Sequence, residues 1–309
     1  MSRLNDISYP DLFKEVKALI ERDDGPPEAN ISTFPDIAQE ALDTILDPGI
    51  DIGDWTTFNK SIFGLRPNEF TILCGPSGAG KSTLLSNIYA CLMAQGIPTF
   101  AAPVEVGQGS FARKVMSIMT GINQNKINEQ AKEIRGKKQD AMFFSNELML
   151  VSKYKSRVNH LQLLCDLLHA HRTRGVQVAL VDNLNFMLQP SDQESMVMQY
   201  DRVIHDFIVF LKSVPMHIFM VMHPRKTDGG RVESEFDIKG SSTAIQEAQN
   251  VLLFNRVRDD FQPPAGIAAR FCRTIKIAKC RENGRACGTE ILFMLDQTSE
   301  KYTEIGFLR

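Results

Sequence analysis

A run of glycines followed by a Lys-Ser pair has the residue types and spacing that bind phosphate groups. The pattern G-x-x-x-x-G-K-S is complete, and Thr83 follows its members Gly75, Pro76, Ser77, Gly78, Ala79, Gly80, Lys81 and Ser82. Residues 70–74 predict a buried strand before it, and residues 82–95 predict an amphipathic helix after it. Glycines let successive backbone N–H groups point at a phosphate, and the N-terminus of a helix favours its negative charge. The segment therefore predicts a site for ATP, or another nucleoside triphosphate, with Mg²⁺.

Two side chains of this loop have expected roles, and a residue from another segment is expected to join them. Lys81 would bridge the β- and γ-phosphates, and the Ser82 hydroxyl would bind Mg²⁺. Asp182 follows the apolar run 176–181 and is expected at the end of a strand, where its carboxylate would support the Mg²⁺. The alternative for Asp182 is a helix cap or a turn, which are common places for aspartate.

Glu105 ends the segment 100–105, which is expected to be the strand next to the strand that carries the phosphate loop. A carboxylate there can orient the water that attacks the γ-phosphate. The alternative is an ordinary solvated glutamate. A phosphate loop, then this Glu, then a strand-end Asp is the layout of RecA-type ATPases.

The bulk properties restrict the function less than the motifs do. The chain is 43% hydrophobic and 23% charged with a net charge of −2, which neither indicates nor excludes a channel for nucleic acid. No apolar stretch is long enough to cross a bilayer, and the N-terminus lacks the apolar centre of a signal peptide. The cysteines form no C-x-x-C pair and are expected to be buried free thiols rather than metal ligands. We therefore expect a cytoplasmic protein with no membrane contact.

Two parts of the chain differ in pattern. Residues 1–49 predict a helical N-terminal segment, with helices at 10–23 and near 35–46 joined by a Gly-Pro-Pro hinge; the first could pack on its own core or on a neighbouring subunit. Residues 50–309 predict an α/β domain with a mostly parallel sheet, helices on both of its faces and antiparallel strands at one edge. Helices are expected near 82–95, 110–119, 156–173, 194–213 and 241–249. Strands are expected near 70–74, 98–103, 148–152, 176–181 and 217–222, followed by antiparallel additions near 251–255, 271–278 and 290–295.

Polar and basic motifs follow the later strands. His223 ends a strongly apolar strand, and a basic Gly-containing loop with Arg225, Lys226 and Arg231 comes after it. The sequence Lys239-Gly240-Ser241 fits a loop that binds the phosphates of a single nucleic acid strand, because Gly allows close approach and Lys adds charge.

Lys279 and Arg281 lie two residues apart on an expected strand and so point to one face, although a solvated strand end gives the same pattern. The basic segment 126–157 is expected to be a solvated helix rather than a channel lining.

Together with Arg113, these motifs over residues 50–305 resemble the helicase domain of DnaB-type replicative ring helicases. His223, where DnaB itself usually has Gln, is more similar to phage primase-helicases and Twinkle. The resemblance implies a RecA-like fold and a homohexameric ring. It also implies that His223 reports the state of the nucleotide, unless this His is only structural. Arg281, with Lys279, would act as an arginine finger in the site of the neighbouring subunit.

The resulting hypothesis is an ATP-dependent replicative DNA helicase that translocates on single-stranded DNA at a replication fork. No zinc-binding cysteine cluster precedes the core, so a primase module is not expected, and primase and polymerase would be separate partners. If a phage encodes the protein, the compartment would be the host cytoplasm. Two alternatives stay open: a RecA-like or recombinase-like DNA-dependent ATPase, and an ATP-binding partner or loader of a helicase.

Overall fold

The computed structural model describes residues 34–46, 49–127, 129–130, 143, 145–154, 157–188, 195–225, 230–240, 242–258, 260–264 and 266–308. The chain divides into two compact units, Met1–Asp47 and Pro48–Arg309. This division lies close to the boundary expected between residues 49 and 50.

The first unit is described through a single helix, α2 (Phe34–Leu46). Pro35 occupies its first turn, where the missing N–H has no cost. Phe34, Ile37 and Leu42 on this helix are exposed. The helix expected at 10–23 lies outside the described residues, and packing of the N-terminal segment on a neighbouring subunit stays a prediction.

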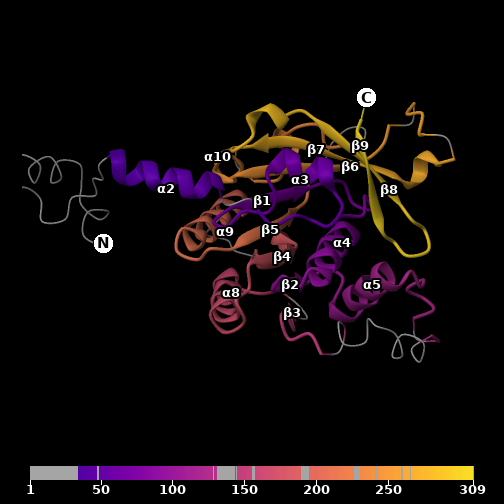
Figure 1. The fold of residues 1–309 in the computed structure, drawn as a ribbon, viewed down its shortest axis with the longest axis horizontal. Coiled ribbons are helices and arrows are strands. Elements are labelled where there is room, and N and C mark those ends of the chain that lie inside the picture. Colours follow the sequence, from indigo (N-terminus) through magenta and orange to yellow (C-terminus); the bar gives the residue numbers. More distant parts are fainter. Residues whose placement is uncertain are drawn as a thin grey trace, which may run out of the picture. The chain divides into compact units, whose positions relative to one another are not determined.

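The second unit is built on a nine-stranded sheet with the order β3-β2-β4-β5-β1-β6-β7-β8-β9 (Figure 1). The strands from β3 to β6 in this order run parallel, and β7, β8 and β9 continue the sheet in antiparallel fashion. The elements along the chain are α3 (Thr56–Ile62), β1 (Phe70–Cys74), α4 (Lys81–Ala94), β2 (Thr99–Pro103), α5 (Gln108–Thr120), β3 (Met149–Val151), α8 (His160–Arg174), β4 (Val178–Asp182), η1 (Leu184–Met187), α9 (Met196–Leu211), β5 (His217–Met222), η2 (Glu235–Asp237), α10 (Ser242–Glu247), β6 (Asn250–Arg256), η3 (Ala269–Phe271), β7 (Cys272–Cys280), η4 (Gly284–Ala286), β8 (Glu290–Leu295) and β9 (Tyr302–Phe307).

This topology confirms the predicted α/β class and corrects two details. The strand expected near 251–255 as an antiparallel addition is β6, and it runs parallel to β1 because α10 supplies a crossover before it. The strand before Glu105 is β2, and it is not the neighbour of β1, because β4 and β5 lie between them. The short helix α3 and the edge strand β9 were not expected.

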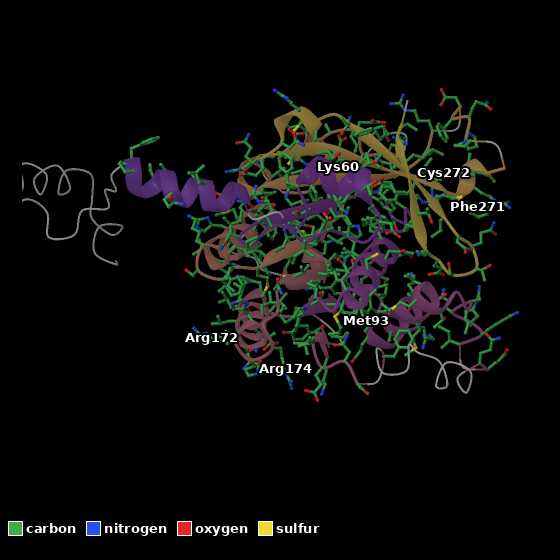
Figure 2. All side chains as sticks on the ribbon, viewed as in Figure 1. Lys60, Met93, Arg172, Arg174, Phe271 and Cys272 are labelled. Atoms are coloured by element: carbon green, nitrogen blue, oxygen red, sulfur yellow. The ribbon has the colours of Figure 1, made fainter. Side chains whose placement is uncertain are left out.

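Apolar side chains form a core on each face of the sheet. On one face, α8 and α9 pack against the strands through residues such as Leu163 and Phe207. On the other face, α3, α4 and α5 pack with the antiparallel strands, and Trp55 contacts Phe293 edge to face. Figure 2 shows Arg172 and Arg174 on the surface at the end of α8, where cations favour the C-terminal end of the helix dipole. No helix among the described residues has both the length and the apolar character that a bilayer span requires.

The cysteines agree only in part with the expectation of buried thiols. All are free, and Cys74, Cys272 and Cys280 are buried. Cys165 and Cys287 are exposed and belong to neither of the two cores. No cluster of three or more metal-binding side chains occurs in the part of the chain that the structure describes.

A buried polar network crosses the sheet at the edge where the central parallel strands begin. The Nδ2 of Asn250 donates to Glu69 Oε2 at 3.0 Å and to Thr71 Oγ1 at 3.2 Å, and Thr71 Oγ1 also contacts His217 Nε2 at 2.9 Å. Burial disfavours charge on both ionisable groups. It therefore raises the pKa of Glu69 to about 7, against the opposing effects of Asn250 and Arg66, and lowers the pKa of His217 to about 4.

We predict that Glu69→Gln stabilises the protein at alkaline pH. Because the pKa of Glu69 is raised in the folded state, its favourable contribution is present below pH 4.5 and is lost as the pH rises through about 7. The variant should match the wild type near pH 4.5 and exceed its free energy of unfolding by up to about 3 kcal/mol at pH 8. Urea unfolding of both proteins across this range measures the difference, in which the titration of His217 cancels. A difference that does not depend on pH would contradict the assignment.

Candidate nucleotide site

The loop between β1 and α4 requires glycine at Gly75 and Gly80, where neighbouring atoms leave no room for a side chain, and at Gly78, where φ is +72°. A Cβ on Gly75 would overlap the carbonyl oxygen of Phe254. Gly80 has φ +105°, and a Cβ there would lie 2.7 Å from Tyr302 Oη. Strands β6 and β9 therefore press directly against the back of the phosphate loop.

Two arginines from the later strands bind the carbonyl groups of this loop. Arg273 Nε donates to Ala79 O at 2.7 Å, and Arg256 Nη2 donates to Gly78 O at 3.1 Å. The buried Arg273 also donates to the carbonyls of Arg270 and Cys272, so its position is defined by three acceptors. In a trans peptide the C=O and the next N–H point in opposite directions. Holding these carbonyls at the back turns the N–H groups of the loop toward its interior, as phosphate binding requires.

Lys81 begins α4 and lies over the loop. Its Nζ donates to Gly75 O at 2.7 Å and to Pro76 O at 3.0 Å. Burial lowers the pKa of Lys81, while the carboxylates of Asp182 and Glu105 oppose that shift. The first turn of α4 has no side-chain cap and no acidic residue, so its N–H groups and the positive end of its dipole remain available to an anion.

The oxygen atoms of Ser82 and Asp182 fit a magnesium ion. Ser82 Oγ donates to Asp182 Oδ2 at 2.5 Å, which joins the start of α4 to the end of β4. Asp182 Oδ1 is buried and has no hydrogen-bond partner among the described residues. Burial raises the pKa of Asp182 to about 6. A hydroxyl, a carboxylate and phosphate oxygens are the hard ligands that Mg²⁺ takes, and the ion would repay the cost of burying this carboxylate.

Asn183 joins Glu105 and His223 although they follow different strands. Its Nδ2 donates to Glu105 Oε2 and lies 2.9 Å from His223 Nε2, while Glu105 Oε2 and His223 Nε2 are 3.6 Å apart. Burial, followed by the positive charge of Lys81, lowers the pKa of His223, which favours the neutral ring that can accept from the Asn183 amide. A cavity of about 320 Å³ opens at this point and is lined by Glu105, Arg157, Asn183, Asn185, Phe186 and His223.

The segment after His223 folds back on the end of β5. The backbone N–H of Lys239 donates to His223 O at 3.2 Å, and Pro224 pairs with Ile238. Arg225, a predicted DNA contact, uses its guanidinium inside the protein: Nε donates to Ile238 O at 3.1 Å and Nη2 to Gly240 O at 2.7 Å. Arg225 therefore braces the Lys239-Gly240 turn.

The remaining predicted DNA contacts fall into two groups. Arg231 forms ion pairs with Glu233 at 3.1 Å and Glu290 at 3.0 Å, which leaves it little freedom to bind a phosphate. Lys226 and Ser241 lie outside the described residues.

Lys279 and Arg281 lie together but far from the phosphate loop of their own chain. Both donate to the carbonyl oxygen of Gln246 at the end of α10, Arg281 Nη2 at 2.6 Å. Cys280 pairs with Asn250 at the start of β6, whereas Arg273 pairs with Arg256 at its end, near the loop. At about 3.3 Å per residue, this places Arg281 on the order of 25 Å from Arg273 along the strand.

Three residues of the site were missed from the sequence. Asn183 could have been noticed, since it directly follows the strand-end Asp182 and a polar residue there faces the same edge. Arg256 and Arg273 carry no local signal. Their acceptors are far earlier in the chain, and only the folded sheet brings them to the loop.

We predict that Arg273→Met weakens nucleotide binding about tenfold, because a hydrogen bond from a charged donor to Ala79 O is lost and the loop carbonyl can turn inward. Titration with a fluorescent ADP analogue in Mg²⁺ measures the dissociation constant. Lys276→Met on the same strand is the matched control, since Lys276 Nζ donates to Glu233 O instead. An unchanged dissociation constant in a variant that melts like the wild type would refute this role.

Comparisons with known proteins agree with this geometry. A family model described as an AAA domain matches residues 55–229, more than half of the chain. A solved structure of an ATPase domain superimposes with a TM-score of 0.72 at 13% identity, covering 89% of this chain and 100% of that one. A DnaB-like replicative helicase, described with its interactions with primase, gives 0.70 at 12% identity and covers 95% of this chain and 72% of that one. The RadB recombinase gives 0.54 at 10% identity, covering 80% and 95%. The chain therefore belongs to the AAA domain family, and it has the RecA-like fold of the ATPase domains of DnaB-type helicases.

Proposed function

We propose that this protein is an ATP-dependent DNA helicase that translocates on single-stranded DNA as a ring of identical subunits, most simply a hexamer. The observation that carries the proposal is the separation of two sets of residues on one sheet. The phosphate loop, Asp182 and Glu105 gather at one edge, while Lys279 and Arg281 lie at the opposite edge and cannot reach the loop of their own chain. Copies arranged head to tail would bring the two sets together at every interface.

The nucleotide chemistry follows from the groups present. Lys81 would leave the carbonyls of Gly75 and Pro76 for the β- and γ-phosphates, and the N–H groups of the loop would bind the β-phosphate. Mg²⁺ held by Ser82 and Asp182 would neutralise charge that develops on the phosphate oxygens. Glu105 accepts a proton from the attacking water, and Asn183 orients Glu105 during this step.

The same site has a direct connection to a candidate DNA-binding turn. His223 contacts the Asn183 amide through its ring and Lys239 through its carbonyl. A change at the γ-phosphate that moves Glu105 would alter this contact and so shift the Lys239-Gly240-Ser241 segment. We assign phosphate contacts to Lys239 and Gly240 and support of the turn to Arg225, while phosphate contacts by Lys226 and Ser241 stay predictions from the sequence. Primase and polymerase would act as separate partners.

We predict that Glu105→Gln abolishes ATP hydrolysis and leaves nucleotide binding unchanged, because the amide keeps the size of the side chain but cannot accept the proton. Phosphate release should fall at least about 100-fold, the usual contribution of a general base. Binding of the fluorescent ADP analogue is the control. Hydrolysis at the wild-type rate would remove Glu105 as the base.

Subunit mixing tests whether Arg281 acts on a neighbour. Arg281→Ala and Lys81→Ala should each be inactive alone, since every interface then lacks one essential group. In mixed assemblies some interfaces combine an intact Lys81 with an intact Arg281, so ATP hydrolysis stimulated by single-stranded DNA should reappear. Mixtures as inactive as the separate variants would show that Arg281 does not act across an interface.

A recombinase-like DNA-dependent ATPase is the second candidate, favoured by the structural likeness to RadB. It would share DNA-stimulated hydrolysis with a helicase but would not separate a forked duplex. Unwinding of a fluorescently labelled fork in the presence of ATP distinguishes the two. A loader that binds ATP would show turnover that is indifferent to DNA.

A further inference from the structure

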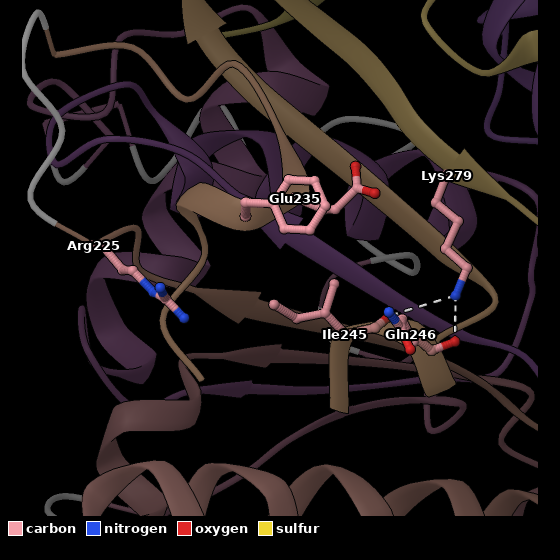
Figure 3. A pocket seen from close by; sticks show the side chains of 6 residues that line it. Arg225, Glu235, Ile245, Gln246 and Lys279 are labelled. Carbon is pink, nitrogen blue, oxygen red and sulfur yellow. Dashed lines mark hydrogen bonds between the residues drawn. The ribbon is translucent and has the colours of Figure 1, made fainter. Parts of the chain in front are cut away.

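A cavity of about 360 Å³ lies between η2 and α10 and has no role in the chemistry described above. Its lining residues are Arg225, Glu235, Phe236, Ile245, Gln246 and Lys279. Figure 3 shows Arg225 and Lys279 on opposite sides of the cavity, with Ile245 and Gln246 between them. Most of the lining comes from η2 and α10, which precede and follow Lys239 and Gly240 in the sequence, and Arg225 and Lys279 complete it. A DNA strand bound by Lys239 and Gly240 would therefore pass beside the cavity.

Phe236 is the unusual member of the lining, because its side chain is 66% exposed. It lies in the short helix η2, whose backbone is held by several hydrogen bonds. Asp237 Oδ2 accepts from the N–H of Ser234 at 3.0 Å and of Glu233 at 2.8 Å, which caps η2. The backbone N–H of Arg225 donates to Asp237 O at 2.6 Å. The turn is thus ordered before any ligand arrives, and its aromatic ring faces solvent.

The residues just before η2 are also fixed by hydrogen bonds. Asn255 exchanges two buried hydrogen bonds with Val232, Nδ2 to the carbonyl at 2.8 Å and Oδ1 from the N–H at 2.9 Å. Ile238, on the other side of η2, is fully buried. Phe236 therefore projects from a segment fixed at both ends, and an exposed ring on a fixed support loses little entropy when a flat ligand covers it.

The rest of the cavity suits a nucleobase. Ile245 is 4% exposed and provides an apolar surface, while Gln246 and Glu235 present amide and carboxylate groups that can bond to the edge of a base. Arg225 directs its N–H groups at backbone carbonyls, so it adds positive charge near a phosphate backbone without competing for the base. The volume exceeds that of a single base.

We propose that this cavity binds an unpaired base of single-stranded DNA, which stacks on Phe236 while Lys239 holds the adjoining phosphate. The inference rests on the proposed DNA-binding function and adds to it a base contact. Every base has a π face and can stack on an aromatic ring, so the site adds affinity for single-stranded DNA without sequence preference.

The test compares the binding of two fluorescent DNA strands, one of thymidine nucleotides and one with abasic sites throughout. Both are about 20 nucleotides long, which exceeds a typical single-strand binding site. A non-hydrolysable ATP analogue is present in each titration. The wild type should bind the thymidine strand more tightly. Phe236→Ala should lose about 5- to 100-fold in affinity for that strand and no longer distinguish the two, since stacking is lost. Phe236→Tyr should keep the preference.

The controls separate stacking from other roles. Phe307→Ala removes another ring that is 54% exposed, at the end of β9, and should behave as the wild type does. The dependence of binding on salt concentration should be the same in Phe236→Ala and the wild type, because phosphate contacts are unchanged. Sedimentation should show assembly unaffected by the substitution.

Three results would overturn the proposal. Equal binding of both strands by the wild type would exclude a base contact while leaving the helicase proposal intact. Loss of assembly in Phe236→Ala would place the ring against a neighbouring subunit instead. Failure of the wild type to bind either strand would refute the proposed function together with this site.

Discussion

The hydrogen bond from Arg273 to the carbonyl of Ala79 is the contact on which the nucleotide site depends. A phosphate loop works only if its N–H groups converge, and nothing in a glycine-rich segment enforces that direction by itself. Strands β6, β7 and β9 enforce it from behind, with Arg273 and Arg256 on the carbonyls and with Phe254 and Tyr302 closing the space where a Cβ would lie. The strands added after the parallel sheet are therefore part of the site.

This dependence explains why the sheet must be continuous from β2 to β9. Glu105 follows β2, Asp182 ends β4, the loop follows β1, and the supports of the loop come from β6, β7 and β9. Parallel strands bring their carboxyl ends to one edge, so residues distant in sequence meet without any local signal. The Ser82–Asp182 hydrogen bond then spans the strand that separates β4 from β1. A one-residue shift in the register of a strand would displace Asp182, Glu105 or the phosphate loop relative to the others.

The sequence was sufficient for features that depend on local patterns. Strands β1 and β5 are fully buried and mostly apolar, and the loop with its helix has a defined spacing, so their positions agree closely with expectation. The edge strand β9 was missed because its burial alternates from Tyr302 onward and polar residues dilute its apolar content. Helix α3 is only 7 residues long, too short to show a period.

Spatial order could not be inferred in the same way. Adjacent placement of β2 and β1 is the simple expectation for consecutive strands, but crossover connections allow β4 and β5 to enter between them. The role of basic residues was equally hidden. A sequence cannot show that Arg225 finds the carbonyls of Ile238 and Gly240 within its own chain, so its charge suggests an external phosphate.

Helix α10 connects the two surfaces that the proposed mechanism must coordinate. It is 6 residues long, and its N-terminus lies two positions after Gly240 in the sequence. Its last carbonyls, of Gln246 and Glu247, accept hydrogen bonds from Arg281 at 2.6 and 3.1 Å. These carbonyls carry the negative end of the helix dipole, so in the proposed ring they would compete with a neighbouring nucleotide for the same guanidinium. A movement of α10 caused by DNA at one end would then change that competition at the other, and such a coupling would act equally in reverse. A helix this short depends on packing, here through Ile245 in the core, rather than on its own hydrogen bonds, so it would move as a unit.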